Sequence, residues 1–545
     1  MNYELIDTDA LGRIGKLEYK NYELITPNLI PVIHPYEENL KPSIIEKIGF
    51  DCIFTNSYII YQDNQKREKV LDLGLKEYLG FNGLIATDSG AFQQYIYNDK
   101  DIHIRPNEIE KFQEDIGSDF PVILDLPVQP DDNYIQAKNK IETSLERAKL
   151  NISRRTKECC WIGPIHGAKY PELLKVSSKE MSKLDFGIYA IGGLVKFFLD
   201  YRFDEVLKIL LTVKKHIVSN KPLHMFGLGL PQFFSLAVAC GCDLMDSAAY
   251  ILYAKENRYF TLSTGTKLLG ELKEFPCCCP MCSNYTPDEV RQCEPSEKTR
   301  LLAIHNLHVS YSELKNIRQA IYDGNLWELV EQRIRSHPKL YESINIIKKN
   351  VLLFERYEKI YKNHGRLLAS IESIQRPLLK RYKQRIKKRY RIPNSTRYLI
   401  ILPELDIRGK KSPSTKKWLN QINNCTIPRD MIHILFFSKF FGLIPIELIN
   451  TYPMGQHESI SLNFFDKEEY MDEYVEIFIS VINSYRLSKK IAYLYPKSFI
   501  NQFYEEEKFR DSFYESIFKV LSTKFKIPIR QFDIISNIIE YFEKE

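Results

Sequence analysis

Short apolar runs alternate with longer amphipathic segments along the first half of the chain. Each run has the length of a buried strand, and the segment after it has helical periodicity. The pattern predicts strands at 52–55, 83–87, 122–124, 161–163, 187–191, 224–226 and 243–245. Repeated strand–helix units indicate an α/β fold. Their economical closure is a (β/α)8 TIM-type barrel, in which an N-terminal segment supplies the remaining strand.

Polar residues and glycines stand where these predicted strands end. They are Asp88, Asp125, His166, the Gly192-Gly193 pair, the 227–229 turn and Asp246. In a barrel, the carboxyl ends of the strands converge on one face, where catalytic groups lie. A single strand-end aspartate is often only a helix N-cap. Several carboxylates at one face, beside glycine turns that let backbone N–H groups approach a ligand, predict a pocket.

The stretch at 86–93 reads Ala-Thr-Asp-Ser-Gly-Ala-Phe-Gln and is the most informative of these strand ends. It follows an apolar run and passes at once into Ser, Gly and a helical pattern, as where a buried strand turns into a helix. A carboxylate at Asp88 with an aromatic ring at Phe92 can hold a planar, hydrogen-bonding heterocycle. The alternative is a turn that only caps the following helix.

Composition changes this picture little. A length of 545 residues suggests two to four domains, and 44% hydrophobic with 27% charged residues is ordinary for a soluble protein. The sequence has no apolar run of about 18 residues and no signal peptide pattern, so we expect a cytoplasmic protein that does not span a membrane. The net charge of +6 says little about partners.

Cysteines cluster in one place. Four of the eleven lie within 277–282, a spacing typical of a metal site and unlike the scatter of a disulfide framework. The predicted ligands of one structural zinc ion are Cys277, Cys279, Cys282 and His305. A Cys3His set is tetrahedral and closed, hence structural. We expect Cys278 to be a bystander; His308 is an alternative fourth ligand, and free buried cysteines are the other interpretation.

A series of ordered motifs extends over residues 1 to about 345. The motifs are LGRIG at 11–15, TNSY at 55–58, DSGAFQ at 88–93, DLP at 125–127, YAIGG at 189–193, HMFG at 224–227, DSAAY at 246–250, the cysteine cluster and SHPKLY at 336–341. With them the chain resembles the archaeal tRNA-guanine transglycosylases, which exchange guanine-15 in the tRNA D-loop for 7-cyano-7-deazaguanine on the way to archaeosine. The resemblance implies a zinc-containing (β/α)8 barrel. It implies tRNA, guanine and 7-cyano-7-deazaguanine as partners, and a possible homodimer.

The resemblance also implies roles for the strand-end residues. The family uses two aspartates, here Asp88 and Asp246. One attacks the ribose anomeric carbon and holds a covalent tRNA intermediate, while the other is the acid/base for the base. Either could be the nucleophile. The implied substrate-binding residues are Ser89, Phe92, Asp125, His166, Gly192 and Gly193. Asp125 would accept from the N–H edge of the base, Phe92 would stack on it, and the backbone around Gly193 would bind its carbonyl.

The fifth predicted strand end departs from the family. The family usually carries Val-Gln-Gly-Gly there, whereas this chain has Ile165-His166-Gly167-Ala168. The Gln amide normally hydrogen-bonds the base carbonyl. A His can donate one hydrogen bond instead, so this change bears on base preference.

Residues 346–392 are predicted to form a basic helical linker. Nine Lys or Arg and no acid lie between Arg376 and Arg391, interleaved with Tyr382 and Tyr390. Such a stretch suits a phosphate backbone, where each contact releases counterions. A solvated helical linker is the alternative.

After Pro393 the pattern restarts as a smaller α/β domain, 393–545, with a charged helical C-terminus. Strands are predicted at 397–403 and 433–437 and a helix at 415–422. Segments 374–377, 442–448 and 452–453 make this domain similar to the α/β domain of archaeosine synthases. The Pro-Cys-Ser motif of that domain is replaced here by Pro403-Glu404-Leu405, so we expect tRNA positioning or partner docking instead of synthase chemistry.

The leading hypothesis is therefore a tRNA transglycosylase with its barrel at 1–345 and a zinc subdomain at about 272–310. One alternative is a catalytically silent tRNA-binding subunit of an archaeosine-synthesis complex. Another is a deazaguanine transglycosylase that acts on DNA. The presence of both aspartates favours the enzyme.

Overall fold

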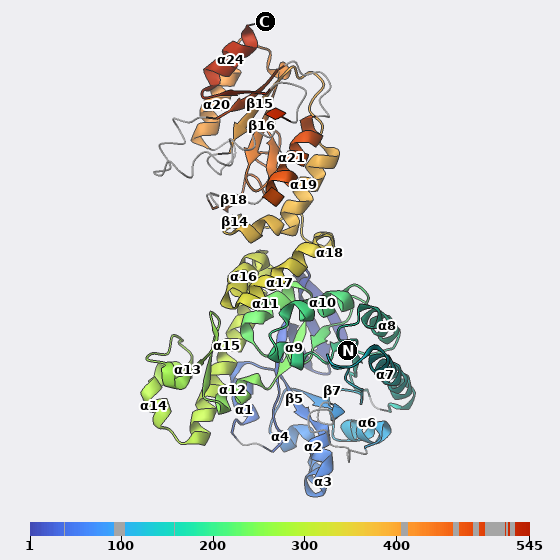
Figure 1. The fold of residues 1–545 in the computed structure, drawn as a ribbon. Helices are drawn as coiled ribbons and strands as arrows, with labels where there is room; N and C mark the ends of the chain where they lie inside the picture. Colours follow the sequence, from blue (N-terminus) through green and yellow to red (C-terminus); the bar gives the residue numbers. More distant parts are fainter. Residues whose placement is uncertain are drawn as a thin grey trace. The chain divides into compact units, whose positions relative to one another are not determined.

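The computed structural model contains two compact units, Met1–Asn350 and Val351–Glu545 (Figure 1). The residues that the structure describes are 1–36, 39–91, 104–156, 158–404, 412–460, 468–482, 490–495, 518, 522–523 and 529–544. Phe92 and Leu405 lie outside them. None of the helices in this described part is both long and apolar enough to cross a membrane.

Parallel strands of the first unit form two sheets. One has the order β4 (Asn28–Pro31), β11 (Leu244–Ser247), β10 (Leu223–Met225), β9 (Ile188–Ile191) and β8 (Ile162–Ile165), and the other β5 (Cys52–Asn56), β6 (Leu84–Asp88) and β7 (Phe120–Pro121). Single parallel bridges, Val32 to Phe54 and Val122 to Ile162, connect the edges of the two sheets. Strand pairing therefore passes from each of these eight strands to the next without a break.

Most of the strands predicted from the sequence are confirmed. Six of the seven predicted segments overlap β5, β6, β8, β9, β10 or β11, and β4 is the N-terminal strand that was expected. The prediction at 122–124 is wrong, because β7 ends at Pro121 and Val122 makes only a bridge. The backbone carbonyls of residues 122, 123 and 124 accept hydrogen bonds from the side chains of Gln113, Ser89 and Arg147, respectively.

One apolar core cluster takes alternate residues from neighbouring strands, as expected where a pleated strand turns every second side chain to the same face. Its members on β5, β6 and β9 are Cys52, Phe54, Leu84, Ala86, Ile188 and Ala190. An antiparallel sheet of β1 (Asn2–Asp9), β2 (Gly12–Tyr19) and β3 (Tyr22–Thr26) adds Leu17, Tyr19 and Leu24 to the same cluster. The N-terminal sheet is thus packed on the core of the parallel strands.

Helices follow these strands, and side chains cap the N-termini of some of them, including α2, α3 and α7. Asn56 accepts a backbone N–H of α2, and Asn133 forms a capping box with Gln136 at α7. The helices are α1 (Pro42–Ile48), α2 (Ser57–Gln62), α3 (Asn64–Leu73), α4 (Leu75–Leu79), α6 (Pro106–Asp115), α7 (Tyr134–Arg154), α8 (Pro171–Ser182), α9 (Val195–Leu199), α10 (Phe203–Lys214), α11 (Pro231–Ala239) and α12 (Ala249–Lys255).

The rest of the first unit is organised on one long helix, α15 (Pro295–Asp323). The hairpin β12 (Arg258–Thr261) and β13 (Gly265–Leu268) precedes it, with α13 (Pro280–Asn284) and α14 (Pro287–Gln292). The helices α16 (Leu326–Arg333) and α17 (Pro338–Lys349) follow. α12, α13 and β12 pack against α15, so this helix joins the cysteine region to the end of the last parallel strand unit.

The second unit has a five-stranded sheet of order β17 (Gly442–Pro445), β16 (Ile432–Ser438), β15 (Tyr398–Pro403), β19 (Lys490–Leu494) and β20 (Ile529–Phe532). Only β17 pairs antiparallel. Helix α20 (Pro413–Asn423) packs on α24 (Ile535–Glu543), and α19 (Pro377–Arg389) packs on α21 (Glu468–Ile482). Shorter elements are α18 (Val351–Tyr357), β14 (Arg366–Leu368) and β18 (His457–Ser459). The two strands and the helix predicted here from the sequence are confirmed.

The basic stretch around 376–391 forms helix α19. Its apolar side packs into the core of the second unit through Leu379, Tyr382 and Ile386. On another side, Lys380 and Lys383 donate to Glu473, and Lys387 donates to Glu476. Arg385, Lys388 and Arg389 remain exposed. This helix is an integral part of the second unit and not a free connector.

Candidate active site

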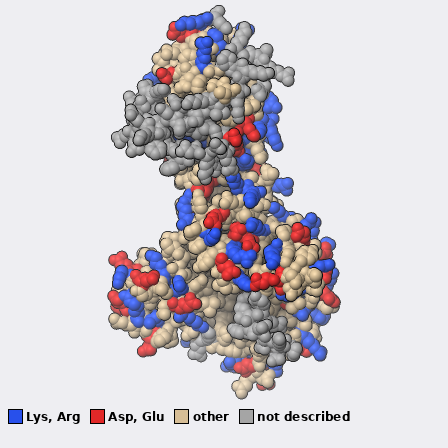
Figure 2. All heavy atoms as spheres, viewed as in Figure 1, with Lys and Arg blue, Asp and Glu red and all other residues tan. Residues whose placement is uncertain are grey.

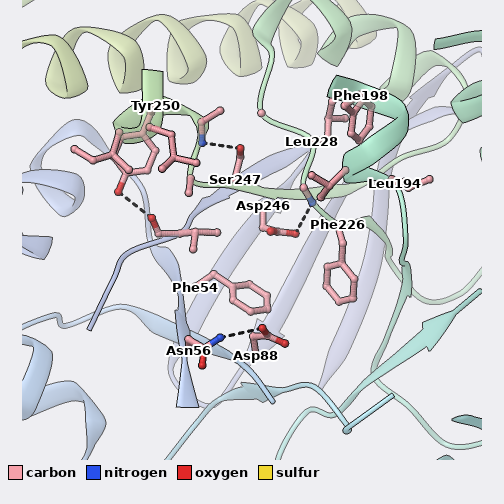
Figure 3. Close-up of a pocket in the computed structure, with 18 of the residues that line it drawn as sticks. Phe54, Asn56, Asp88, Leu194, Phe198, Phe226, Leu228, Asp246, Ser247 and Tyr250 are labelled. Atoms are coloured by element: carbon pink, nitrogen blue, oxygen red, sulfur yellow. Dashed lines mark hydrogen bonds between the residues drawn. The ribbon is translucent and has the colours of Figure 1, made fainter. Parts of the chain in front are cut away.

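A cavity of about 820 Å³ opens where the parallel strands of the first unit end. Asp88 is the last residue of β6, and Asp246 lies in β11. Six of the residues singled out from the sequence line the cavity, namely Asp88, Asp125, His166, Gly192, Gly193 and Asp246. In Figure 3 the ring of Phe54 lies between Asp88 and Asp246 in the view shown. The fold thus brings residues from five strand ends to one place.

Asp88 is held by neutral donors. The side-chain amide of Asn56 donates to Asp88 Oδ2 at 3.0 Å, while the Asn56 Oδ1 accepts the N–H of Ile59, which fixes the orientation of the amide (Figure 3). Burial raises the pKa of Asp88 to about 7, and the nearby carboxylates Asp125 and Asp246 add to this, against backbone N–H donors that lower it. Near neutral pH this carboxyl can therefore both release and accept a proton.

Asp246 has a different environment. His224 Nε2 lies 2.8 Å from Asp246 Oδ1, and the backbone N–H of Gly227 donates to the same oxygen at 3.3 Å (Figure 3 draws the Gly227 bond). Phe54 and Phe226 make edge contacts with the imidazole of His224, at centroid distances of 6.3 and 4.9 Å. Among the described residues no donor reaches Oδ2, so one carboxylate oxygen is oriented and the other is available.

Asp125 forms a second pair with a histidine. His166 Nε2 hydrogen-bonds Asp125 Oδ2, and the His166 side chain is only 2% exposed. A Cβ on Gly192 would lie 2.3 Å from His166 Cε1, so glycine at this position makes room for the imidazole. The His166 ring N–H was expected to serve a bound base, but here Nε2 is engaged by Asp125, because the imidazole reaches the neighbouring strand end.

The remaining sequence candidates are placed as follows. Ser89 is buried and does not line the cavity; its hydroxyl donates to the carbonyl of Ile123 at 3.0 Å. Gly193 has a φ of +76°, and a Cβ there would lie 2.3 Å from the carbonyl oxygen of Val128, so only glycine fits. Phe92 lies outside the described residues.

Sequence reasoning missed the partners of the aspartates. Asn56 ends β5 as Asp88 ends β6, and the two residues are aligned in the parallel pairing, so strand-end position could have identified it. His224 lies within β10, where a polar residue in an apolar strand and its place in the HMFG motif were the local signals. Phe54 and Phe226, which also line the cavity, are ordinary strand residues in the sequence.

The cysteine region forms a compact cluster of possible metal ligands. One ligand atom from each of Cys277, Cys279, Cys282 and His305 lies within 4.8 Å of the others. His305 Nδ1 is 3.5 Å from Cys279 Sγ and 3.3 Å from Cys282 Sγ. Its Nε2 lies 3.0 Å from the carbonyl oxygen of Phe260, which fixes the tautomer with the proton on Nε2 and leaves the Nδ1 lone pair for a metal ion.

The surroundings of the cluster fit a closed site. Neither Cys278, which is exposed, nor His308 belongs to it. The ring of Tyr259 stacks on His305 at a centroid distance of 3.6 Å, and its hydroxyl lies 3.4 Å from Cys282 Sγ. Three thiolates and one imidazole are the donor set of a tetrahedral structural site, so these residues could hold a metal ion without an open position.

The residue after His305 connects this cluster to the cavity. Asn306 Oδ1 accepts the backbone N–H of Phe260 at 2.8 Å, and its Nδ2 donates to the carbonyl of Tyr250 at 3.0 Å. Tyr250 lines the cavity, and its hydroxyl donates to the carbonyl of Val32 at 3.0 Å. The cluster and the cavity wall therefore share one segment of α15.

Charge on the visible face of the first unit does not mark a nucleic-acid path. Figure 2 shows Lys and Arg interspersed there with Asp and Glu. On α19 of the second unit, by contrast, Arg385, Lys388 and Arg389 are exposed, and none of the three makes an ion pair with a described residue. Positions 385, 388 and 389 are spaced three and four residues apart, so the three basic side chains lie on one side of the helix.

Comparison with known proteins gives a consistent result. Residues 7–339 match the family described as TGT, queuine tRNA-ribosyltransferase. The tRNA-guanine(15) transglycosylase of Methanocaldococcus jannaschii is 38% identical over 519 residues, which cover 93% of this chain and 76% of that protein. The protein of the same name from Methanococcus maripaludis strain C5 is 38% identical over 483 residues, 87% of this chain and 72% of its own length. A third, from Pyrococcus abyssi, is 42% identical over 388 residues, or 71% of this chain and 66% of its own length.

Proposed function

The chain belongs to the TGT family, and on that premise we propose that it exchanges guanine-15 of tRNA for 7-cyano-7-deazaguanine in archaeosine biosynthesis. The observation that carries the chemistry is the pair Asp88 and Asp246 in one cavity, each with a different set of hydrogen-bond donors. Two carboxyl groups in unlike environments can divide the work between proton transfer and nucleophilic attack.

Asp246 is the nucleophile in this proposal. Its carboxylate attacks C1′ of the ribose, the bond from C1′ to N9 of guanine breaks, and a glycosyl ester of Asp246 forms. The leaving guanine takes the proton of Asp88. The incoming base then returns a proton from its N9–H to Asp88 while N9 attacks C1′ and expels the Asp246 carboxylate. Each displacement attacks C1′ from the face opposite the departing group and inverts it, so the two in succession restore the original configuration.

The contacts of the two carboxyl groups support this assignment. A pKa of about 7 suits Asp88 for giving a proton in the first step and taking one in the second. Asp246 is oriented through Oδ1 by His224 and Gly227, which leaves Oδ2 for the ribose. The opposite assignment would require Asp88 to attack while half-protonated near neutral pH.

Base recognition is proposed to rest on the Asp125 side of the cavity. Asp125 accepts from the N–H edge of the base, and the backbone at Gly192 and Gly193 approaches its carbonyl, because neither position admits a Cβ. Phe92 stacks on the base in this proposal, from the segment outside the described residues. The base must leave the tRNA stack to enter such a cavity.

We propose that the eight parallel strands form a (β/α)8 barrel. The unbroken strand pairing, closed by the bridges at Val32 and Val122, supports this closure, as does the core cluster built from alternate strand residues. A barrel explains why the polar strand ends of β5 to β11 meet at one cavity.

We also propose one structural zinc ion per chain at Cys277, Cys279, Cys282 and His305. The Cys3His donor set and the hydrogen bond from His305 Nε2 to Phe260 support zinc. When bound, the ion would link the cysteine segment 277–282 to His305 on α15 and would offer no reactive position. A homodimer, as the resemblance implied, stays a prediction.

The second unit is proposed to position tRNA. Three exposed basic side chains on α19 suit contacts with phosphates, namely Arg385, Lys388 and Arg389. Lys380 and Lys383, by contrast, form ion pairs with Glu473. The replacement of the synthase Pro-Cys-Ser motif by Pro403-Glu404-Leu405 supports a binding role for this unit.

The direct test is incorporation of labelled 7-cyano-7-deazaguanine into unmodified tRNA by wild type, Asp88→Asn and Asp246→Asn. We expect incorporation by wild type, its loss in both variants, and no covalent tRNA adduct with Asp246→Asn on a denaturing gel. An adduct with Asp246→Asn would reverse the nucleophile assignment. Wild type that contains zinc and binds tRNA without incorporation would instead be a silent subunit. Incorporation into DNA but not tRNA would favour the DNA-acting alternative.

A further inference from the structure

Two of the three aspartates in the cavity are each paired with a buried histidine. His224 Nε2 bonds Asp246, and His166 Nε2 bonds Asp125. The side chains of His224 and His166 are 0% and 2% exposed, and the Nδ1 of each has no hydrogen-bond partner among the described residues. For a buried imidazole with a single polar contact, the hydrogen bond to the aspartate is the main polar interaction of the ring. Asp88, in contrast, accepts its side-chain hydrogen bond from the amide of Asn56.

Each imidazole is fixed by its neighbours. The rings of Phe54 and Phe226 make edge contacts with His224, and the space above Gly192 holds His166. Because a carboxylate can only accept, Nε2 of each histidine carries the proton that it shares. A fixed ring with a fixed donor sets the rotation of the carboxylate it contacts, and in neither pair does the ring itself need to touch a ligand.

We propose that His224 and His166 are positioning residues with separate duties. His224 orients Asp246 for attack on the ribose, and His166 orients Asp125 for the base. The proposal rests on the proposed function and deepens it. The pairs stand on different strand ends, β10 with β11 and the ends of β7 and β8, so each can be disturbed without moving the other.

The experiment separates base binding from turnover. Equilibrium dialysis with labelled 7-cyano-7-deazaguanine gives the Kd of the base, and incorporation into tRNA at saturating base gives kcat. We expect His224→Phe to lower kcat at least tenfold and to leave the Kd within twofold. We expect His166→Phe to raise the Kd about tenfold. His216→Gln, two residues after the end of α10 and outside the cavity, is the control and should change neither.

Glutamine variants distinguish positioning from packing. The amide of a Gln can place an N–H near the site of His Nε2. The kcat of His224→Gln and the Kd of His166→Gln should therefore lie within about threefold of the wild-type values. Thermal unfolding of all variants identifies any that do not fold. If a Phe variant does not fold, the two Gln variants decide the outcome. His166→Gln also installs the residue that the family usually has.

Three results would overturn the inference. They are a normal kcat for His224→Phe in an otherwise active enzyme, an equal loss of base affinity in both Phe variants, and Gln variants as impaired as the Phe variants. An inactive wild type would instead overturn the proposed function, while the comparison of base affinities would still decide the role of His166.

Discussion

The side-chain amide of Asn56 donates to Asp88 at 3.0 Å, and this neutral contact does not offset the burial of the carboxyl group. Across the cavity an imidazole N–H and a backbone N–H both serve one oxygen of Asp246. Two aspartates at strand ends of one sheet system thus differ in chemistry because their partners differ. The consequences can be measured.

The first prediction concerns pH. In the proposed mechanism guanine departs with the proton of Asp88, whose pKa is about 7, so the single-turnover rate of adduct formation should be constant below pH 6. Above pH 8 it should fall about tenfold per pH unit. Quenched-flow measurement of the covalent tRNA adduct between pH 5.5 and 9 checks this. Asn56→Leu removes a donor to the charged form and should move the fall to higher pH; a profile centred near pH 4 would contradict the assignment.

The second prediction concerns stability. The folded-state pKa of Asp88 is raised above its value in the unfolded chain, so folded protein holds the extra proton between about pH 4 and 7 and stability falls as pH rises through that range. Asp88→Asn removes this effect and should raise the free energy of unfolding by about 1–3 kcal/mol at pH 8, and by less at pH 5. Urea unfolding at both pH values measures it. Asp185→Asn, at an exposed aspartate, should change stability by less than about 0.5 kcal/mol.

The third prediction concerns the space over Gly192. In Gly192→Ala the new Cβ would meet His166 Cε1 at 2.3 Å and displace the imidazole from Asp125. We expect the KM for the base to rise about tenfold, since a misplaced hydrogen-bonding group costs about 1–3 kcal/mol. Gly270→Ala is the control, because a Cβ there has no atom within 4 Å. An unchanged KM in Gly192→Ala would show that the imidazole position does not matter for the base.

The fourth prediction concerns the metal. Atomic emission should find one zinc ion per chain in the wild type and none in Cys279→Ser. The variant should also have a lower unfolding temperature, because a structural site contributes on the order of 3 kcal/mol or more to folding. Cys278→Ser replaces the exposed neighbour and should retain full zinc and normal stability. Zinc loss in Cys278→Ser with retention in Cys279→Ser would mean that the ligand set is shifted by one residue.

The fifth prediction concerns RNA contact by the second unit. Replacing Arg385 and Arg389 by Ala should weaken tRNA binding about equally for all tRNA sequences and reduce the slope of log K against log salt by about two. Filter binding between 50 and 300 mM salt measures the slope. Lys175→Ala with Lys179→Ala removes an equally spaced exposed pair from α8 and should leave the slope unchanged. Equal slopes in both double variants would place RNA elsewhere.

Local patterns in the sequence were enough for the strands and for the residues that end them. Apolar runs such as 187–191 depend only on burial, and Asp88 or Asp246 follow directly from where such a run stops. The prediction at 122–124 is wrong because its carbonyls accept hydrogen bonds from side chains of α6 and α7, contacts that the apolar pattern of the segment does not reveal. The pairing of His166 with Asp125 joins residues 41 positions apart, and the resemblance gave a glutamine there.

The hydrogen-bond partners of the aspartates could be identified only from the three-dimensional structure. His224 is 22 residues from Asp246, and Asn56 is 32 residues from Asp88. A motif identifies the two candidate carboxylates, but their hydrogen-bond donors are set by which strands become neighbours. Strand order, and not spacing along the chain, determines which aspartate receives a histidine and which receives an amide.

Asn306 connects the cysteine cluster to the cavity through Phe260 and Tyr250. If the proposed zinc ion is lost, the neighbouring His305 loses its ligand contact, and we expect the disturbance to pass along α15 to the wall of the cavity. On the proposed function, tRNA in a cell whose zinc supply fails would then stay unmodified although Asp88 and Asp246 are intact. The nutritional state of the cell would in this way be recorded in its tRNA.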